Sequence, residues 1–189
     1  TIPKKHEVIL VDNSQDELLK EIADNYDCNL IVNKENLGCP TAWNIGAEYE
    51  NKNFFLFSNP DTLFLPNTIE ELMKAVKRYP KVSAFNPKII DRKNNHYFKR
   101  RSVLMPRSEW MSRKYPKTDC EVSVLHGSAI FIKKENFFKL NGFDERIFLY
   151  HDDDDISIRL KREIGPLMYI NNSEIVHLAG RSSTRDKEI

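Results

Sequence analysis

Four consecutive large apolar residues, 54–57, are followed at once by the polar turn Ser58-Asn59-Pro60-Asp61. The run is too short to cross a membrane, and it favours a strand buried on both faces of a parallel sheet. Pro60 fixes its own φ and pushes Asn59 into an extended conformation, so Asp61 leaves the strand in a rigid turn. Ligands of open α/β sheets bind at the carboxyl ends of strands, where a carboxylate suits a hard cation. An ordinary Asx-type turn is the alternative interpretation.

Short apolar segments alternate with helical patterns along the chain. Asn13 or Ser14 is expected to cap the first helix, and Asn86-Pro87 is expected to stop a strand at 82–85. This alternation predicts an α/β sandwich around a mainly parallel sheet. The first helix is expected to bury Leu18, Leu19 and Ile22. Strands are predicted at 7–11, 29–33, 54–57, 82–85, 122–133, 167–170 and 175–177, and helices at 15–25, from Pro40 onward, and at 67–79, 135–140 and 152–163.

Composition excludes several classes of protein. With 29 Lys+Arg against 28 Asp+Glu, the formal net charge is +1, so no general basic field predicts a nucleic-acid partner. The three cysteines lack C-x-x-C spacing, which fits a reducing compartment and gives no zinc motif. No apolar run approaches the length of a membrane helix.

The segment 91–120 is a long, basic and poorly periodic connection. A connection of this length in a compact domain is usually functional or mobile. It either steers an anionic donor or acceptor or is a plain solvated loop. Its basic residues include Lys99, Arg100, Arg101, Arg107, Arg113 and Lys114.

Four aspartates, 152–155, stand at the start of a predicted helix. Acidic residues gather at helix amino ends because the macrodipole and the free N–H groups favour them, and this alone accounts for one or two of the four. Asp153 precedes Ile156 by three residues and shares its face, so Asp153 is expected to point inward and to serve as a general base. Whether Asp152 or Asp153 is the inward one depends on where the helix starts. Asp155 is expected to form a surface ion pair with Arg159.

Several motifs stand in a characteristic order and spacing, and each is weak alone. They are Val11-Asp12-Asn13-Ser14, Asn36-Leu37-Gly38 with Asn44-Ile45-Gly46, Ser58-Asn59-Pro60-Asp61-Thr62, Gly142-Phe143-Asp144-Glu145, and Asp152-Asp153-x-Asp155 with Arg159-Leu160. In this order the chain resembles family 2 glycosyltransferases, most closely the rhamnosyltransferase-like branch that decorates bacterial surface polysaccharides. The resemblance runs from Glu7 to about Ser182.

This resemblance implies a single GT-A domain over 1–189, with 181–189 as a charged tail. Such enzymes transfer a sugar from a nucleotide-diphosphate donor with inversion at the anomeric carbon. A dTDP- or UDP-sugar is the expected donor, and a glycan or lipid-diphosphate-linked hydroxyl is the expected acceptor. The expected location is the cytoplasm, with peripheral association at the inner face of the plasma membrane as a further expectation.

The resemblance also implies roles for individual residues. Asp153 matches the aspartate that deprotonates the acceptor, with Asp152 beside it, and Gly127 would leave room for the acceptor. Asp61 and His177 would hold Mg²⁺ or Mn²⁺ against the diphosphate, although a strand-end histidine bonded to a carbonyl is otherwise the commoner case. The nucleotide-sugar pocket would be formed by Asp12, Asn13, Ser14, Asn36, Asn44 and Asn59.

Two departures from the family pattern matter. The family begins with a further strand before the one that carries Asp12, and only Thr1 to His6 precede Glu7 here. An exposed sheet edge and weak or absent activity are therefore expected for this chain. Asn59 stands in place of the usual first acid, which weakens metal binding at that position. A catalytically silent nucleotide-sugar binding module is the alternative function.

Overall fold

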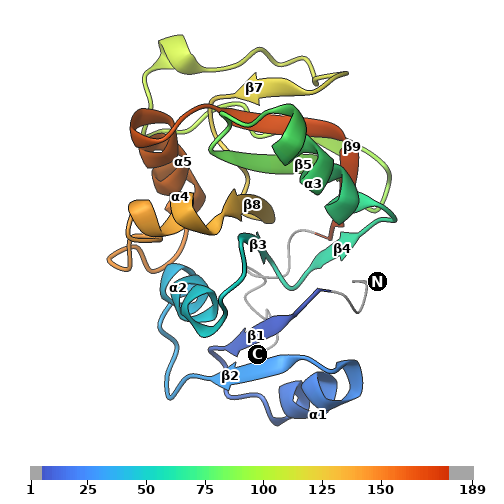
Figure 1. Ribbon diagram of the computed structural model, residues 1–189, viewed down its shortest axis with the longest axis vertical. Helices are drawn as coiled ribbons and strands as arrows, with labels where there is room; N and C mark the ends of the chain where they lie inside the picture. Colours follow the sequence, from blue (N-terminus) through green and yellow to red (C-terminus); the bar gives the residue numbers. More distant parts are fainter. Residues whose placement is uncertain (1–5, 179–189) are drawn as a thin grey trace, which may run out of the picture.

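The computed structural model describes residues 6–178 and places them in two β-sheets flanked by helices (Figure 1). The charged tail predicted at 181–189 lies outside the described residues. The strands are β1 (Ile9–Asp12), β2 (Asn29–Val32), β3 (Phe54–Ser58), β4 (Thr62–Phe64), β5 (Ala84–Ile90), β6 (His96–Tyr97), β7 (Cys120–Val122), β8 (Ala129–Lys133) and β9 (Leu167–His177). The helices are α1 (Glu17–Tyr26), α2 (Cys39–Tyr49), α3 (Thr68–Arg78), α4 (Lys134–Lys139) and α5 (Asp152–Glu163), with a 3₁₀ turn at Arg107–Glu109.

A seven-stranded sheet forms the body of the protein, in the order β3-β8-β5-β9-β4, with β6 beside β5 and β7 beside β9. Within the described residues, β5–β9 is the single parallel pair of this sheet, so the expectation of a mainly parallel sheet is wrong. Two of the five antiparallel pairs come from β8, which follows β7 through a loop and not through a crossover helix and runs between β3 and β5. The short strands β4, β6 and β7 make the other three, each along β5 or β9.

The central strands present alternate side chains to two helical layers. In β8, Ile130 packs in one cluster with Leu160 of α5, whereas Phe131 packs in another with Leu72 of α3. All four side chains are buried. Successive residues of a strand point to opposite faces, so a sheet covered on both sides reads as a continuous apolar run. The expected three-layer sandwich is confirmed.

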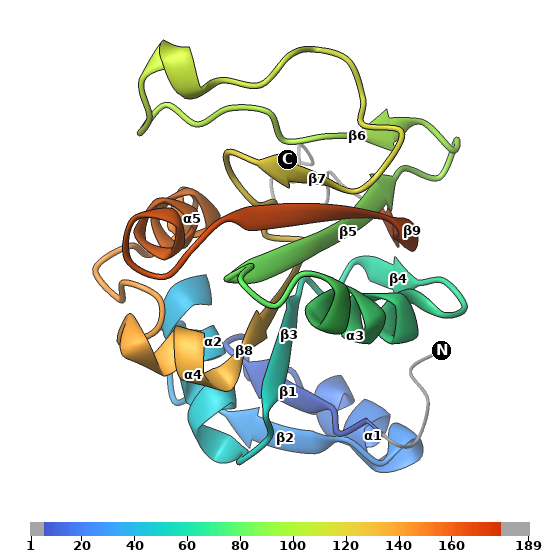
Figure 2. The ribbon, with the colours of Figure 1, turned by 45° about the horizontal axis from the view of Figure 1, so that its top comes forward.

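β1 and β2 form a separate parallel pair that is joined by α1 and lies at the bottom of Figures 1 and 2. Within residues 6–178 this pair makes no ladder with the larger sheet, so the edge of β1 that does not pair with β2 has no strand partner there. Asp16 caps α1, and not Asn13 or Ser14, because the side chain of Asp16 accepts a hydrogen bond from the Leu18 N–H at 3.0 Å. Ser14 is already bonded to Asp12.

The predicted burial of α1 is wrong in two of three positions. Leu18 is 64% exposed and Ile22 is 43% exposed, while Leu19 is half-buried. The residue that α1 buries is Ala23. An amphipathic pattern indicates that a helix has an apolar face, but it does not say what covers that face.

Two strand boundaries also differ from the prediction. β5 runs through Asn86-Pro87, because a register shift between Pro87 and Lys88 accommodates a residue without an N–H. The two strands predicted near the carboxyl end are one continuous strand, β9.

The basic connection contains β6 and the 3₁₀ turn and arches over β5 and β9 at the top of Figure 2. Among residues 6–178, no helix combines the length and the apolar character needed to cross a membrane.

Candidate active site

Asp61 sits in the turn between β3 and β4, opposite the end of β9. The β4–β9 ladder pairs Thr62 with His177, and the Leu178 N–H donates to the carbonyl of Asp61 at 2.9 Å. This register brings Nε2 of His177 to 3.1 Å from Oδ1 of Asp61. Asn59, at the start of the turn, is half-buried and donates its backbone N–H to the Ser128 carbonyl at 3.3 Å. The structure therefore brings the two predicted metal ligands together.

The donor set of Asp61 and His177 fits a divalent cation. A carboxylate oxygen and an imidazole nitrogen are ligands that Mn²⁺ accepts, and both side chains are partly exposed, at 28% and 16%. Among the described residues no group of three or more His, Cys, Asp or Glu side chains is arranged to hold a metal. Asp61 and His177 are therefore the side chains that would hold such a cation.

Asp153 lies in the first turn of α5 and faces the loop between β7 and β8. Its Oδ2 accepts a hydrogen bond from the Gly127 N–H at 2.8 Å, and the Lys99 Nζ is 2.7 Å from the same oxygen. A Cβ on residue 127 would lie 3.4 Å from that oxygen, which is ordinary van der Waals contact. No described residue donates a hydrogen bond to Oδ1 of Asp153.

The other three aspartates of α5 have different surroundings. Burial, and then the charge of Asp153, raise the pKa of Asp152 above its ordinary value. Burial pushes the pKa of Asp154 upward, but Lys99 and His151 outweigh it and hold this pKa below its ordinary value. Asp155 forms the predicted ion pair with Arg159 at 2.6 Å, but the pair is half-buried and not at the surface. The reason is that Arg159 also donates to the carbonyls of Leu140 and Gly142.

His126 connects the two halves of the site. Its ring lies 5.4 Å from the ring of His177, centroid to centroid, and the next residue, Gly127, donates to Asp153. The base candidate and the Asp61–His177 pair therefore lie on the same side of the molecule. Burial lowers the pKa of His126 to about 4, so its ring is neutral at pH 7. Neither His126 nor the contact of Lys99 was found from the sequence, because both depend on pairings between distant segments.

The Asp12 carboxylate organises the turn after β1. Its Oδ1 accepts hydrogen bonds from the Ser14 N–H and hydroxyl and from the Gln15 N–H, and its Oδ2 accepts from the Asp16 N–H. Burial favours a higher pKa for Asp12, but these bonds outweigh it and leave the pKa below its ordinary value. Asn13 donates to the Gly38 carbonyl at 2.9 Å. Asp12, Asn13 and Ser14 thus lie together, as expected.

Comparisons with known proteins place these features in a family. A family model described as Glycosyl transferase family 2 matches residues 2–140. The chain belongs to glycosyltransferase family 2. Two curated relatives in this comparison are rhamnosyltransferases. The chain is 27% identical over 149 residues to the N-acetylglucosaminyl-diphospho-decaprenol L-rhamnosyltransferase of Mycobacterium tuberculosis, covering 69% of this chain and 48% of the relative. It is also 26% identical over 197 aligned positions to the rhamnosyltransferase WbbL of Escherichia coli, covering 92% and 73%. The chain thus spans about half the length of the mycobacterial relative.

Solved structures of similar proteins confirm the GT-A fold of the transferase. GalNAc-T7, determined with UDP, GalNAc and Mn²⁺, matches with a TM-score of 0.72 at 18% identity, over 94% of this chain and 39% of that one. The mannosyltransferase PcManGT from Pyrobaculum calidifontis, in complex with GDP-Man and Mn²⁺, matches with a TM-score of 0.66 at 13% identity, over 94% and 49%. At these identities the likeness shows the fold alone.

Two predicted pocket residues of the transferase are engaged within the protein. Asn44 is buried and clamps the loop before α5, because it donates to the Phe143 carbonyl at 3.0 Å and accepts from the Phe143 N–H at 2.9 Å. Asn36 is exposed, and its side chain accepts from the Gly38 N–H at 3.0 Å. Both residues shape the loops that border α2.

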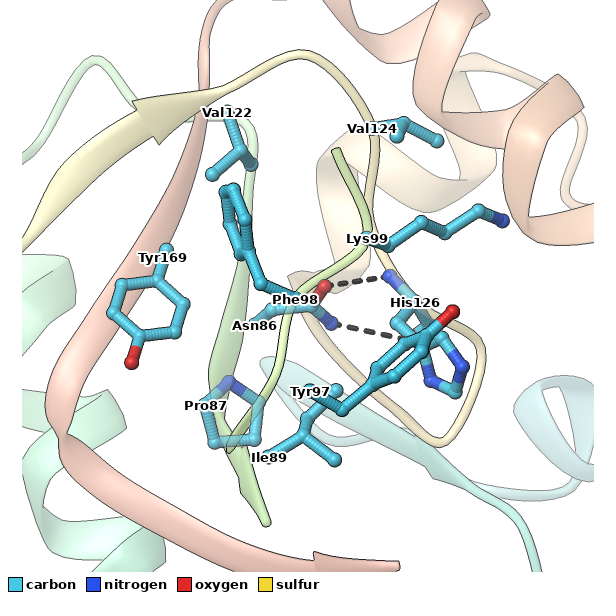
Figure 3. Close-up of a pocket in the computed structure, with 10 residues that line it drawn as sticks. All are labelled: Asn86, Pro87, Ile89, Tyr97, Phe98, Lys99, Val122, Val124, His126 and Tyr169. Atoms are coloured by element: carbon cyan, nitrogen blue, oxygen red, sulfur yellow. Dashed lines mark hydrogen bonds between the residues drawn. The ribbon is translucent and has the colours of Figure 1, made fainter. Parts of the chain in front are cut away.

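A small cavity lies beside Lys99 and His126 (Figure 3). It is lined by Asn86, Tyr97, Phe98 and His126 among others, and Lys99 extends on the side away from Tyr169. Its volume of about 10 Å³ has room for about one water molecule, far less than a sugar needs. The cavity therefore belongs to the wall of the site and is not the sugar pocket.

Proposed function

We propose that this transferase moves a sugar from a nucleotide-diphosphate donor to an acceptor hydroxyl with inversion at the anomeric carbon. Asp153 is the base, and Asp61 and His177 hold Mg²⁺ or Mn²⁺. The observation that carries the proposal is the 3.1 Å approach of Asp61 and His177, with His126 and Gly127 linking that pair to Asp153. These groups come from segments far apart in the chain and lie together on one side of the molecule.

Each protein group has a defined task in this reaction. A divalent cation offsets the negative charge that develops on the leaving diphosphate. The carboxylate of Asp153 accepts the hydroxyl proton at Oδ1, the oxygen left without a donor. The acceptor oxygen forms the new bond to the anomeric carbon as the bond to the diphosphate breaks, so a single base on the opposite face suffices for inversion. Gly127, whose N–H holds the other oxygen of Asp153, is proposed to border the acceptor.

The turn after β1 is the proposed nucleotide site. Asp12, Asn13 and Ser14 form it, and Asn36 and Asn44 hold the neighbouring loops in place. Asn59 borders the donor sugar from the turn that carries Asp61. A dTDP- or UDP-sugar is the proposed donor, and an assay with several nucleotide sugars decides between them.

The proposed acceptor is a glycan or lipid-diphosphate-linked sugar of bacterial surface polysaccharide synthesis. The guanidinium groups of Arg100, Arg101 and Arg107 lie 5.9, 4.9 and 5.7 Å from the Trp110 ring, and none has a carboxylate partner among the described residues. Val103 in the same turn is 77% exposed. A basic turn with exposed apolar residues suits an anionic lipid acceptor and supports work at the inner face of the plasma membrane, in the cytoplasm.

Calorimetry with UDP-, dTDP- and GDP-sugars, with and without Mn²⁺, tests the donor site. We expect one donor to bind more tightly with Mn²⁺. Asp61→Ala should weaken this binding at least about tenfold and remove its dependence on Mn²⁺. Asp12→Ala should weaken binding with and without the metal, because the turn loses its organising carboxylate. Asp91→Ala is the matched control, since Asp91 organises an exposed turn in the same way between β5 and β6.

Turnover separates the enzyme from a silent binding module. Asp153→Asn keeps the shape of the side chain and should leave donor binding unchanged while lowering donor turnover, measured as release of the nucleoside diphosphate, by about 10²- to 10⁴-fold. A wild-type chain that binds the donor and releases no product would favour the binding module. Failure to bind any nucleotide sugar would reject both functions for this chain.

A further inference from the structure

Lys99 reaches from the basic connection into the first turn of α5. Its Nζ is 2.7 Å from Oδ2 of Asp153 and 2.7 Å from Oδ1 of Asp154, and its side chain is 17% exposed. Ser102, in the same segment, is buried, and its hydroxyl accepts a hydrogen bond from the Leu104 N–H at 3.0 Å. This part of the connection is therefore packed against the helix start and is not a solvated loop.

The start of α5 carries a crowded set of negative charges. Asp152, Asp153 and Asp154 are consecutive, and adjacent carboxylates disfavour each other's ionised form. Three groups from other elements interact electrostatically with Asp153: Lys99 from the connection, His126 from the loop before β8, and the Cys39 thiol from α2. Burial, reinforced by Asp152 and Asp153, raises the pKa of Cys39 to about 12, and burial keeps His126 neutral. Among these described groups, Lys99 is the one that brings a positive charge to Asp153.

We propose that Lys99 is a positioning residue of the transfer reaction, which keeps the Asp153 carboxylate ionised and fixed against Gly127 with Oδ1 free. The inference rests on the proposed function, in which Asp153 is the base. A carboxylate accepts a proton only in its ionised form, and a cation 2.7 Å away favours that form. A nearby cation also makes a carboxylate a weaker proton acceptor. Lys99 divides its charge between Asp153 and Asp154, so this weakening of Asp153 is smaller than it would be in an exclusive ion pair.

The pH dependence of donor turnover tests this role. Lys99→Met keeps the length of the side chain and removes its charge, so the acid limb of the kcat/KM profile should move upward by about one pH unit. The loss of rate should be largest at the acid end of the profile, where it approaches about tenfold, and it should shrink as the pH rises. Lys99→Arg should restore most of the wild-type profile. Lys99→Met/Asp154→Asn should restore part of it, because one competing negative charge is gone.

Lys88→Met is the matched control. Lys88 forms a similar half-buried ion pair with Glu174 at 2.7 Å, in strands outside the start of α5. This variant should leave the pH profile unchanged. A Lys99→Met profile that falls equally at all pH values would assign Lys99 a structural role only, and an unchanged profile would overturn the proposal outright. Thermal unfolding of each variant shows that it is folded, and Lys99→Gln replaces any Lys99→Met protein that is not.

A second measurement does not depend on turnover. In protein labelled with ¹³C at aspartate side chains, the Asp153 signal is identified by its loss in Asp153→Asn. Its titration midpoint should lie about one pH unit higher in Lys99→Met than in wild type. An equal midpoint in the two proteins would end the inference, whereas a shifted midpoint in a chain that releases no product would reject the proposed function alone.

Discussion

The large sheet and the β1–α1–β2 unit are held together by different means. On the large sheet, Phe137 of α4 and Ile156 of α5 are 1% and 0% exposed and lie in one apolar cluster with side chains of β3 and β8. In the small unit, Leu18 and Ile22 face outward, and the turn after β1 is held by hydrogen bonds to one carboxylate, that of Asp12. Close packing fixes the first region, and local polar contacts fix the second.

This difference matches the division of labour proposed for the site. Asp61, His177 and Asp153 belong to the large sheet and its helices, where an error of about 1 Å in position would be costly to the reaction. The nucleotide turn belongs to the small unit. Recognition of a ligand by a turn tolerates more local freedom than proton transfer does. Three measurements test this contrast between the large sheet and the small unit.

The largest effect is expected from the aromatic cluster of the large sheet. Phe137 lies 4.9 Å from the Phe57 ring and 5.6 Å from the Phe143 ring, centroid to centroid. Phe137→Ala should lower the free energy of unfolding by about 3–5 kcal/mol, measured with urea, because it leaves a cavity. The neighbour Phe138 is 38% exposed, and Phe138→Ala should cost clearly less. Equal losses in the two variants would break the comparison.

A smaller effect should appear as a dependence on pH. Burial lowers the pKa of His126 to about 4 from an ordinary value of 6.5. Between these values the unfolded chain binds more protons, so stability should rise with pH across this window, by up to about 3 kcal/mol. Urea unfolding of wild type and of His126→Gln at pH 4 to 7 measures the difference. In His126→Gln the free energy of unfolding should rise less steeply with pH than in wild type. Identical pH dependences in the two proteins would contradict the burial of a neutral ring.

The smallest effect is expected on α1. Leu18→Ser and Ile22→Ser should each change the free energy of unfolding by no more than about 0.5 kcal/mol, because their side chains already face solvent. The same urea titration measures both. A loss of more than about 1.5 kcal/mol in either variant would show that this face is covered in solution, and the contrast between the two regions would then disappear.

Local signals in the sequence were sufficient to predict the strand end and the helix start that carry the candidate site residues. The apolar run before Asp61 and the helix start at Asp152 were placed correctly, since each depends on a few neighbouring residues. The expected partnership of Asp61 with His177 came from the family resemblance, and the β4–β9 register brings it about. The cap of α1 was misplaced because Ser14 was already committed to Asp12.

Contacts between distant segments could not be predicted in the same way. Nothing in the spacing of the basic connection selects Lys99 over Arg100 or Arg101 as the partner of Asp153. The loop between β7 and β8 does not by itself decide whether β8 runs parallel or antiparallel to β5. Pro87 read as a strand stop because the bulge beside it forms only when β9 is in place. These outcomes follow from packing, which a single sequence does not display.

The continuity of α5 and β9 has a mechanical consequence. Asp153 stands near the start of the helix, His177 ends the strand, and only residues 164–166 separate the two elements. Asp61 is tied to the end of the same strand through the Leu178 N–H. The proposed base and the proposed metal ligands are therefore carried by one helix–strand unit with a three-residue connection, so a shift of that unit would move all three together.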